Sequence, residues 1–236
     1  MNRLYFVRHG EGQDNVARQY SSRRVDNPLS ERGVLQAGQT AEHLVGKSID
    51  EVYSSPMKRA TETARIIAAR LKKDVAILEN FRELDVGDLE GQIFSDENWE
   101  FYHGITSGWL EGNTEIPFPG GENYLVLWER WRGGLVQILA GNTGRTFLLV
   151  GHAGIFTATL KDLCPEVDVN WLMSAECYNC SITELGIEVL DGEPRGVLIH
   201  WAAHDHLSGE ALSLVPGIPP VESSADAPDS PSASNT

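Results

Sequence analysis

Two histidines in this sequence directly follow short apolar segments that have the character of buried strands. The letters LYFV run into Arg8 and His9, and the letters FLLV run through Gly151 into His152. The carboxyl ends of parallel strands meet at one edge of an open α/β sheet, where such proteins place their ligands. A neutral imidazole at that edge can attack a phosphoryl group as a nucleophile. The pattern therefore predicts that His9 and His152 share a site.

Two arginines stand in positions that suit the same site. Arg8 lies beside His9, and Arg59 lies in the first turn of a helix expected after the strand-like letters EVYSS. Guanidinium groups match the oxygens of a phosphoryl group better than ammonium groups do, and helix N-termini favour anions. Two arginines with two histidines can hold and transfer a phosphoryl group without a metal. The alternative for Arg59 is a surface ion pair with Glu62 or Glu51.

Six motifs, in order, give the chain a specific resemblance to a known family. They are VRHGEGQDN at 7–15, NPLSERGVLQA at 27–37, YSSPMKRATETA at 53–64, FRELDVGDLEG at 81–91, PGGEN at 119–123 and VGHAGIF at 150–156. The letters NCSITEL at 179–185 continue the likeness. The chain resembles the histidine phosphatase superfamily, which contains cofactor-dependent phosphoglycerate mutases and many small-molecule phosphatases. The resemblance implies an α/β fold, a three-layer α/β/α sandwich with a mostly parallel central sheet.

The resemblance also implies roles for the four residues at the strand and helix ends. His9 is expected to be the nucleophile that becomes a phosphohistidine. Arg8, Arg59 and His152 are expected to be catalytic residues that bind the transferring phosphoryl group. The family pattern calls for no metal or other cofactor in this chemistry, and we expect none here.

Three further residues belong to the expected site. Asn15 and Ser21 are expected to assist in binding phosphate, although Asn15 alternatively suits a helix cap. The leaving alkoxide needs a proton, and the family places its acid in the motif that contains Glu83. We therefore expect Glu83 to be protonated when substrate binds and to activate water afterwards. Asp85 is the alternative acid. Asp85 and Asp88 could also supply the like charge that keeps Glu83 protonated, and their alternative is a solvated acidic loop.

Hydrophobic periodicity predicts alternating strands and helices. Helices are expected at 29–46, 57–71, 122–141 and 153–163. Strands are expected at 3–7, 51–55, 75–79, 146–152, 180–185, 187–190 and 196–201. The strands at 180–185 and 187–190 are expected to form a hairpin through Gly186.

The helix at 29–46 shows both a start signal and an apolar face. Ser30 is placed to cap it. Leu35, Ala41, Leu44 and Val45 are expected to form its buried face.

One domain is expected over residues 1–214. The segment at about 87–121 holds seven glycines and several aromatic residues, which predicts an irregular insertion on the substrate side. Its aromatic residues could line a substrate cavity or pack the insertion down: Phe94, Trp99, Phe101, Tyr102, Trp109 and Phe118. Residues 215–236 are rich in Pro, Ser, Ala and acidic residues, so a disordered tail is expected there.

Composition limits the partners of this protein. The 236 residues include 19 basic and 34 acidic ones, a formal charge of −15, which disfavours nucleic acid and anionic membranes as partners. The N-terminal apolar run is too short for a signal peptide, and no run approaches a membrane span, so a cytoplasmic location is expected. The expected partner is a small phosphorylated metabolite. A homodimer is left open.

Two other groups of residues could suggest a metal. Cys177 and Cys180 have the spacing of a redox or zinc pair, but no second ligand pair follows them, and the odd total of three cysteines argues against a disulfide framework. The letters HWAAHDH at 200–206 crowd three histidines and an aspartate near a strand end. Neither group matches a site of the family, and we expect no metal at either.

The reaction class follows from the charge of the insertion. A phosphoglycerate mutase must hold a second anionic group, yet no Lys or Arg lies between Arg82 and Arg130. This favours a phosphatase that hydrolyses a small phosphomonoester. Arg18, Arg23 and Arg24 could still contact an anion, so a mutase remains the alternative. A non-catalytic module that binds phosphorylated ligands is the second alternative.

Overall fold

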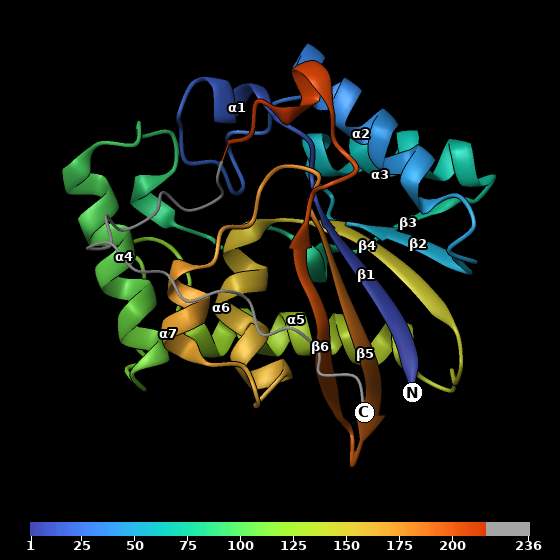
Figure 1. The fold of residues 1–236 in the computed structure, drawn as a ribbon. Helices are drawn as coiled ribbons and strands as arrows, with labels where there is room; N and C mark the ends of the chain where they lie inside the picture. The colour runs from blue at the N-terminus through green and yellow to red at the C-terminus, as the bar shows by residue number, and fades with distance from the viewer. Residues whose placement is uncertain (216–236) are drawn as a thin grey trace.

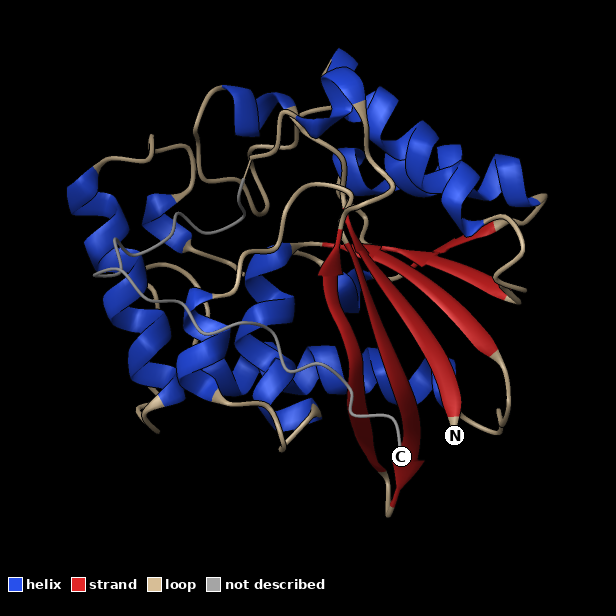
Figure 2. Ribbon diagram, viewed as in Figure 1, coloured by secondary structure: helices blue, strands red, loops and turns tan. Residues whose placement is uncertain are grey.

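A six-stranded sheet runs through the middle of the protein between layers of helices (Figures 1 and 2). This structure is a computed structural model, and it describes residues 1–215. The strands are β1 (Asn2–Arg8), β2 (Glu51–Ser54), β3 (Val75–Ile77), β4 (Thr146–Gly151), β5 (Ile182–Leu190) and β6 (Glu193–Ala203). Their order is β3-β2-β4-β1-β5-β6. Strands β1 to β4 are parallel, and β5 and β6 are antiparallel additions, which confirms the predicted mostly parallel α/β sheet.

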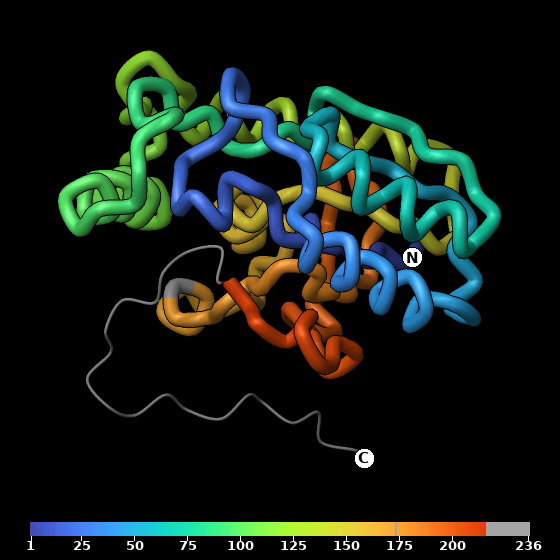
Figure 3. The backbone as a smooth tube through the Cα atoms, turned by 90° about the horizontal axis from the view of Figure 1, so that it is seen from above, coloured from blue at the N-terminus to red at the C-terminus, as the bar shows by residue number. Residues whose placement is uncertain are grey.

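Helices cover both faces of the sheet. They are α1 (Gln13–Val16), α2 (Glu31–Leu44), α3 (Lys58–Leu71), α4 (Asp96–Leu110), α5 (Tyr124–Leu139), α6 (Ala153–Leu163) and α7 (Val169–Ser174). Three short 3-10 turns are η1 (Glu79–Phe81), η2 (Gly87–Leu89) and η3 (Gly209–Leu212). Helices α2 and α3 lie on one side of the sheet, and α5 and α6 lie on the other, with α4 and α7 beyond them (Figures 1 and 3).

The central strands are apolar throughout because both of their faces are buried. In β1, Leu4 and Phe6 belong to the core beneath α5 and α6. Tyr5 and Val7 belong to the core beneath α2 and α3. Alternate side chains of a strand point to opposite faces, so a strand that is covered on both sides reads as a continuous apolar run. This accounts for the abrupt change from apolar residues to Arg8, where the strand leaves the core.

The buried face of α2 differs from the expected one. Leu35 is 46% exposed and Val45 is 45% exposed, so both expectations were wrong. The buried positions follow helical spacing: Gly33, Gln36, Ala37, Thr40, Ala41 and Leu44. Leu35 lies off this stripe, and Val45 lies past the end of the helix. The predicted cap is confirmed, because the backbone N–H of Gly33 donates to the Ser30 hydroxyl at 3.0 Å.

The insertion at 87–121 was expected to be irregular, and nearly half of it is instead the regular helix α4. Ser95 caps this helix by accepting from the Asn98 N–H at 3.2 Å. Gly104 and Gly108, two of the glycines that led to the prediction of an irregular insertion, lie inside the helix. A glycine inside a helix is unfavourable by itself, so tertiary packing must supply the stability that propensity lacks. That packing comes from buried aromatic side chains on α4, such as Trp109 against Phe118.

The expected hairpin through Gly186 was also wrong. Strand β5 continues through Gly186 because it pairs with β1 on one side and with β6 on the other. The chain reverses at Asp191 and Gly192, which both have positive φ angles of 53° and 82°. A two-residue Asp-Gly turn of this kind suits the twist of the flanking strands.

Two expectations concern the C-terminal tail and helices that could span a membrane. Of the tail predicted for 215–236, all but Val215 lies outside the described residues, and the domain boundary at 214 stays a prediction. In the part of the chain that the structure describes, no helix is both long enough and apolar enough to cross a membrane.

Candidate active site

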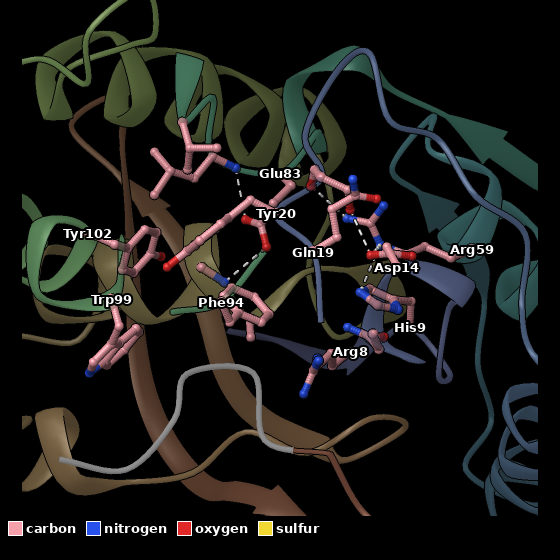
Figure 4. A pocket seen from close by; sticks show the side chains of 16 residues that line it. Arg8, His9, Asp14, Gln19, Tyr20, Arg59, Glu83, Phe94, Trp99 and Tyr102 are labelled. Atoms are coloured by element: carbon pink, nitrogen blue, oxygen red, sulfur yellow. Dashed lines mark hydrogen bonds and ion pairs between the residues drawn. The ribbon is translucent and has the colours of Figure 1, made fainter. Parts of the chain in front are cut away.

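A cavity lies at the carboxyl ends of β1 and β4 (Figure 4). The register of these strands pairs Arg8 with Gly151, so His9 and His152 emerge next to each other with ring centroids 5.1 Å apart. Six of the predicted site residues line the cavity: Arg8, His9, Asn15, Ser21, Arg59 and Glu83. His152 is fully buried behind Arg59 and does not itself line the cavity.

Hydrogen bonds assign the tautomer of His9. Its Nδ1 lies 2.7 Å from the Gly10 carbonyl oxygen, which can only accept, so Nδ1 carries the proton. Its Nε2 accepts from Arg59 Nε at 3.0 Å. Burial, together with the charges of Arg59 and Arg8, holds the pKa of His9 well below its ordinary value of 6.5. The imidazole is therefore neutral at physiological pH, and its Nε2 lone pair faces Arg59.

Arg59 projects from the first turn of α3 into the protein, where only 2% of its surface is exposed. Its Nη2 donates to the Ser21 carbonyl oxygen at 3.1 Å and to His152 Nδ1 at 3.2 Å. The surface alternatives fail, because Glu62 accepts from a backbone N–H and Glu51 pairs with another arginine. Among the described residues, Arg59 Nη1 is buried without a hydrogen-bond partner.

Arg8 is the second buried guanidinium of the cavity. Its Nη1 donates to the carbonyl oxygens of Cys177 and Val215 at 2.7 and 2.8 Å. Its Nε is buried and has no partner within residues 1–215. Buried N–H groups are rarely left without an acceptor, so the unpaired donors on Arg8 and Arg59 point to an anionic ligand. A phosphoryl group offers the oxygens that these donors lack.

His152 supports Arg59 from below. Its Nδ1 accepts from Arg59, so Nε2 carries the proton and donates to the Ser55 hydroxyl at 2.7 Å. Burial and the charge of Arg59 hold the pKa of His152 well below its ordinary value. A neutral His152 orients the guanidinium without competing with it for an anion. Ser55 was not singled out from the sequence, although it lies in the YSSPMKRATETA motif.

The loop after β1 brings two more predicted residues to the cavity. The Asn15 side-chain oxygen accepts from the Gly12 N–H at 2.9 Å, so Asn15 caps α1 and lines the cavity at once. The Ser21 hydroxyl donates to Asp14 at 2.6 Å. Sequence reasoning missed Asp14, whose carboxylate lies 3.6 Å from Arg59 Nε. It also missed Asn179, whose amide donates to the His9 carbonyl oxygen at 3.0 Å and to Asn15 at 3.3 Å.

This loop is held against the start of α2. The buried Glu11 accepts from the Ser30 hydroxyl at 2.6 Å and from Arg32 at 2.7 Å. The close approach requires glycines, because a Cβ on Gly33 would lie 2.1 Å from the Glu11 carbonyl oxygen. The motif at 27–37 therefore positions the loop that carries His9.

Glu83 enters the cavity from the segment after η1. Its carboxylate accepts from the N–H groups of Gly154, Ile155 and Leu84 at 3.1, 2.8 and 2.8 Å. Two of these groups belong to the first turn of α6, which starts directly after His152, so the helix N-terminus fixes the carboxylate. The alternative acid Asp85 does not line the cavity and instead pairs with Arg23 at 2.9 Å.

Arg130 on α5 braces the segment that carries Glu83. It forms a bidentate pair with Glu122, with N–O distances of 2.6 and 3.0 Å. It also donates to the carbonyl oxygens of Asn80, Arg82 and Glu83 at 3.0, 2.7 and 3.1 Å. The backbone of Glu83 is thus tied to the helix layer beneath it.

Aromatic side chains form the wall of the cavity farther from His9. They are Tyr20, Phe94, Trp99 and Tyr102. Burial and the nearby Glu83 raise the pKa of Tyr102 well above its ordinary value, so its hydroxyl stays neutral. Phe101, Trp109 and Phe118 do not line the cavity. The buried Trp109 and Phe118 rings meet edge to face, and the exposed Phe101 ring meets the Phe118 ring of this pair.

The two groups that could suggest a metal have structural partners. His206 Nε2 lies 3.0 Å from the Thr40 hydroxyl, and His204 lies against the Tyr178 ring. Cys177 and Cys180 are buried free thiols. Across residues 1–215, no three His, Cys, Asp or Glu side chains are grouped as a metal site.

Comparisons with known proteins find relatives among phosphoglycerate mutases and phosphatases. The chain is 32% identical over 216 residues to a probable phosphoglycerate mutase of Proteus mirabilis, covering 91% of this chain and 99% of that one. It is 30% identical over 207 residues to phosphoserine phosphatase 1 of Hydrogenobacter thermophilus, covering 88% and 95%. A mycobacterial glucosyl-3-phosphoglycerate phosphatase solved with VO3 matches with a TM-score of 0.71 at 28% identity, covering 86% of this chain and all of that one.

The family assignment rests on nearly the whole described chain. The model of the histidine phosphatase superfamily (branch 1) matches residues 4–199, which include every predicted site residue. The solved relative has the same fold, so the three-layer α/β/α architecture that the resemblance implied, that of phosphoglycerate mutase-like proteins, is confirmed. This chain belongs to the histidine phosphatase superfamily.

Proposed function

We propose that this protein is a phosphoric monoester hydrolase that works without a metal and forms a phosphohistidine on His9. The observation that carries the proposal is the neutral Nε2 of His9 beside two buried arginines with unpaired N–H groups. The substrate is a small phosphomonoester whose phosphoryl oxygens accept from Arg8 and Arg59. Relatives named phosphatases support this reaction class.

In the first half-reaction, the Arg59 Nε–H that donates to His9 Nε2 in the free protein turns to a phosphoryl oxygen. Nε2 then attacks phosphorus while the bond from phosphorus to the leaving oxygen breaks. The Nδ1 proton stays on the ring and donates to the Gly10 carbonyl oxygen, which stabilises the positive charge that the imidazole gains. Arg8 and Arg59 stabilise the charge on the equatorial oxygens. Protonated Glu83 gives its proton to the leaving oxygen, so that an alcohol departs.

In the second half-reaction, water attacks the phosphohistidine. Ionised Glu83 takes a proton from that water, the bond from phosphorus to Nε2 breaks, and inorganic phosphate leaves. Glu83 is thereby protonated again and His9 is again neutral. One carboxyl group serves both steps because the alcohol and the water occupy the same side of the phosphoryl group.

The phosphoglycerate mutase of Proteus mirabilis makes a mutase the competing assignment. A mutase must hold a second anionic group of its substrate during the transfer, and the insertion supplies no Lys or Arg for this task. Of the three arginines that could have done so, Arg23 and Arg24 pair with Asp85 and Glu90 at 2.9 and 3.2 Å, and Arg18 is exposed and does not line the cavity. These pairs favour hydrolysis over transfer.

The direct test is a panel of phosphomonoesters assayed with EDTA, with and without 2,3-bisphosphoglycerate. We expect phosphate release that EDTA does not reduce. Mutase turnover faster than phosphate release would assign the protein to the mutases. Tight binding of phosphorylated ligands without any turnover would instead indicate a binding module.

A further inference from the structure

The cavity is divided between a charged side and an aromatic side. Figure 4 shows His9 and Arg59 on one side and the rings of Phe94, Trp99 and Tyr102 on the other. The rings contact one another: Trp99 stacks on Tyr102 with centroids 5.7 Å apart, and Phe94 meets the Tyr20 ring edge at 4.2 Å. A phosphoryl group bound at His9 would direct its leaving group past Glu83 toward these rings.

Backbone pairing holds the aromatic wall in place. The N–H of Phe94 donates to the Arg18 carbonyl oxygen at 2.7 Å, and the N–H of Gly91 donates to the Tyr20 carbonyl oxygen at 2.9 Å. An isolated antiparallel bridge joins Gln19 to Ile93. These bonds link the loop after β1 to the start of the insertion, so Tyr20 and Phe94 form a preformed surface.

The cavity is lined by as many basic as acidic side chains, among the described residues. Arg8 and Arg59 are its basic residues, and Asp14 and Glu83 are its acidic ones, among the lining residues within 1–215. A phosphate dianion engages both arginines. A second anionic group on the substrate would lie among aromatic rings and near Glu83, without a cation to pair with.

Three arginines outside the cavity are already paired with carboxylates. Arg82 pairs with Glu79 at 2.9 Å, and Arg130 pairs with the buried Glu122 at 2.6 Å. Arg23 is likewise paired with Asp85. Recruiting any of them for a substrate would require one of these ion pairs to break.

We propose that this site selects phosphomonoesters whose leaving group is uncharged and presents an apolar ring face, as an aromatic ring or a sugar does. The ring stacks on Trp99 and Phe94, and a second anionic group is disfavoured. The inference rests on the proposed phosphatase function and adds a substrate class to it. Phosphoserine and 3-phosphoglycerate, which both carry a carboxylate, are expected to be poor substrates.

The first experiment compares matched substrates. Benzyl phosphate and 4-carboxybenzyl phosphate differ by one carboxylate on the same ring, and ethyl phosphate lacks the ring. We expect kcat/KM for benzyl phosphate to exceed that for the carboxylated ester by about tenfold or more. We expect it to exceed that for ethyl phosphate by about three- to tenfold. Glucose 6-phosphate, compared with benzyl phosphate, distinguishes a sugar from an aromatic ring as the preferred face.

The second experiment removes the stacking surface. Trp99→Leu is expected to raise KM for benzyl phosphate about three- to tenfold and to leave ethyl phosphate unchanged. Trp128→Leu is the matched control, because Trp128 lies on α5 with a similar partial exposure and does not line this cavity. Inhibition by inorganic phosphate should stay the same in both variants, which shows that the phosphate side is intact.

The outcomes separate the inference from the proposed function. Equal turnover of benzyl and carboxybenzyl phosphate would overturn the substrate class while the phosphatase stands. Equal effects of Trp99→Leu on the ring and ethyl esters would overturn the stacking role. If none of these esters nor 4-nitrophenyl phosphate releases phosphate, the proposed function fails and the inference fails with it.

Discussion

At the scale of single residues, the two histidines and Glu83 have different roles in the site. His9 and His152 are neutral because burial and neighbouring arginines lower their pKa values. Both histidines use an unprotonated ring nitrogen to accept a hydrogen bond from Arg59, at Nε2 of His9 and at Nδ1 of His152. Glu83 is held by backbone N–H groups at the start of α6, within the same cavity. Gly10 and Arg59 thus hold His9, His152 holds Arg59, and the start of α6 holds Glu83.

Glu83→Gln tests the acid role, because the amide keeps the shape of the side chain and cannot donate its proton to an alkoxide. We expect kcat for benzyl phosphate to fall about 10²- to 10⁴-fold. The first turnover of 4-nitrophenyl phosphate should fall much less, because nitrophenolate leaves without a proton. Stopped-flow absorbance should then show a burst followed by slow turnover.

Asp85→Asn is the control for this variant. Asp85 pairs with Arg23 outside the cavity, so most activity should be retained. If Glu83→Gln slowed the first turnover of both esters equally, or if Asp85→Asn had the larger effect, Glu83 would not be the acid.

The residues that act at the site were easier to predict than the residues that hold them. Arg8, His9 and Arg59 lie in short motifs with local chemical meaning, and the structure brings them together. Arg130 reaches the Glu83 backbone across 47 positions, and Asn179 reaches His9 across 170. Such long-range hydrogen bonds leave no periodic signal in a single sequence.

At the scale of elements, strand ends and helix starts position the residues of the site. Strands β1 and β4 deliver the two histidines, α3 delivers Arg59, and the first turn of α6 fixes Glu83. The expectations that failed concern elements whose packing overrides local preference. Helix α4 forms despite its glycines, and Leu35 is exposed because it lies off the buried stripe of α2.

Arg130→Lys tests the brace between α5 and the Glu83 segment. A lysine has no planar fork, so it cannot keep the bidentate pair with Glu122 and the three carbonyl contacts together. We expect kcat to fall about 10- to 100-fold, because misplacing a catalytic group by about 1 Å has effects of this size, with KM nearly unchanged. Steady-state kinetics on benzyl phosphate measures kcat and KM separately.

Arg132→Lys is the matched control on the same helix. Arg132 pairs with Glu129 and Glu193, and within the described residues its side chain has no hydrogen bond or ion pair with η1 or Glu83. It should leave both kcat and KM unchanged. An equal loss of kcat in the two variants would mean that α5 acts through general stability and not by positioning Glu83.

At the scale of the whole molecule, an acidic chain with a charge of −15 binds anions only where buried arginines are concentrated. The buried histidines make the stability of the fold depend on pH. Burial lowers the pKa values of His9 and His152, and it lowers that of His206 to about 4, with a further contribution from His43. Each of them resists protonation in the folded state more than in the unfolded state.

The free energy of unfolding should therefore decrease as the pH falls below 6.5. The unfolded chain takes up protons there that the folded chain does not, so the stability contribution is complete above pH 6.5 and is lost toward the folded-state pKa values. The slope should reach about 1.4 kcal/mol per pH unit for each fully buried histidine. Urea unfolding between pH 7 and 5 measures it.

His206→Gln should make this decline shallower, and His200→Gln, at an exposed position, should leave it unchanged. A free energy of unfolding that stays constant from pH 7 to 5 would contradict the buried neutral histidines.

The most direct test of the account is to locate the phosphoryl group during turnover. Wild-type protein mixed with excess benzyl phosphate or 4-nitrophenyl phosphate, quenched in alkali and digested, should carry a phosphoryl group on His9 by mass spectrometry. His9→Ala should keep its fold, form no phosphoenzyme and release no phosphate. A phosphoryl group on another residue, or an active His9→Ala variant, would contradict the central claim.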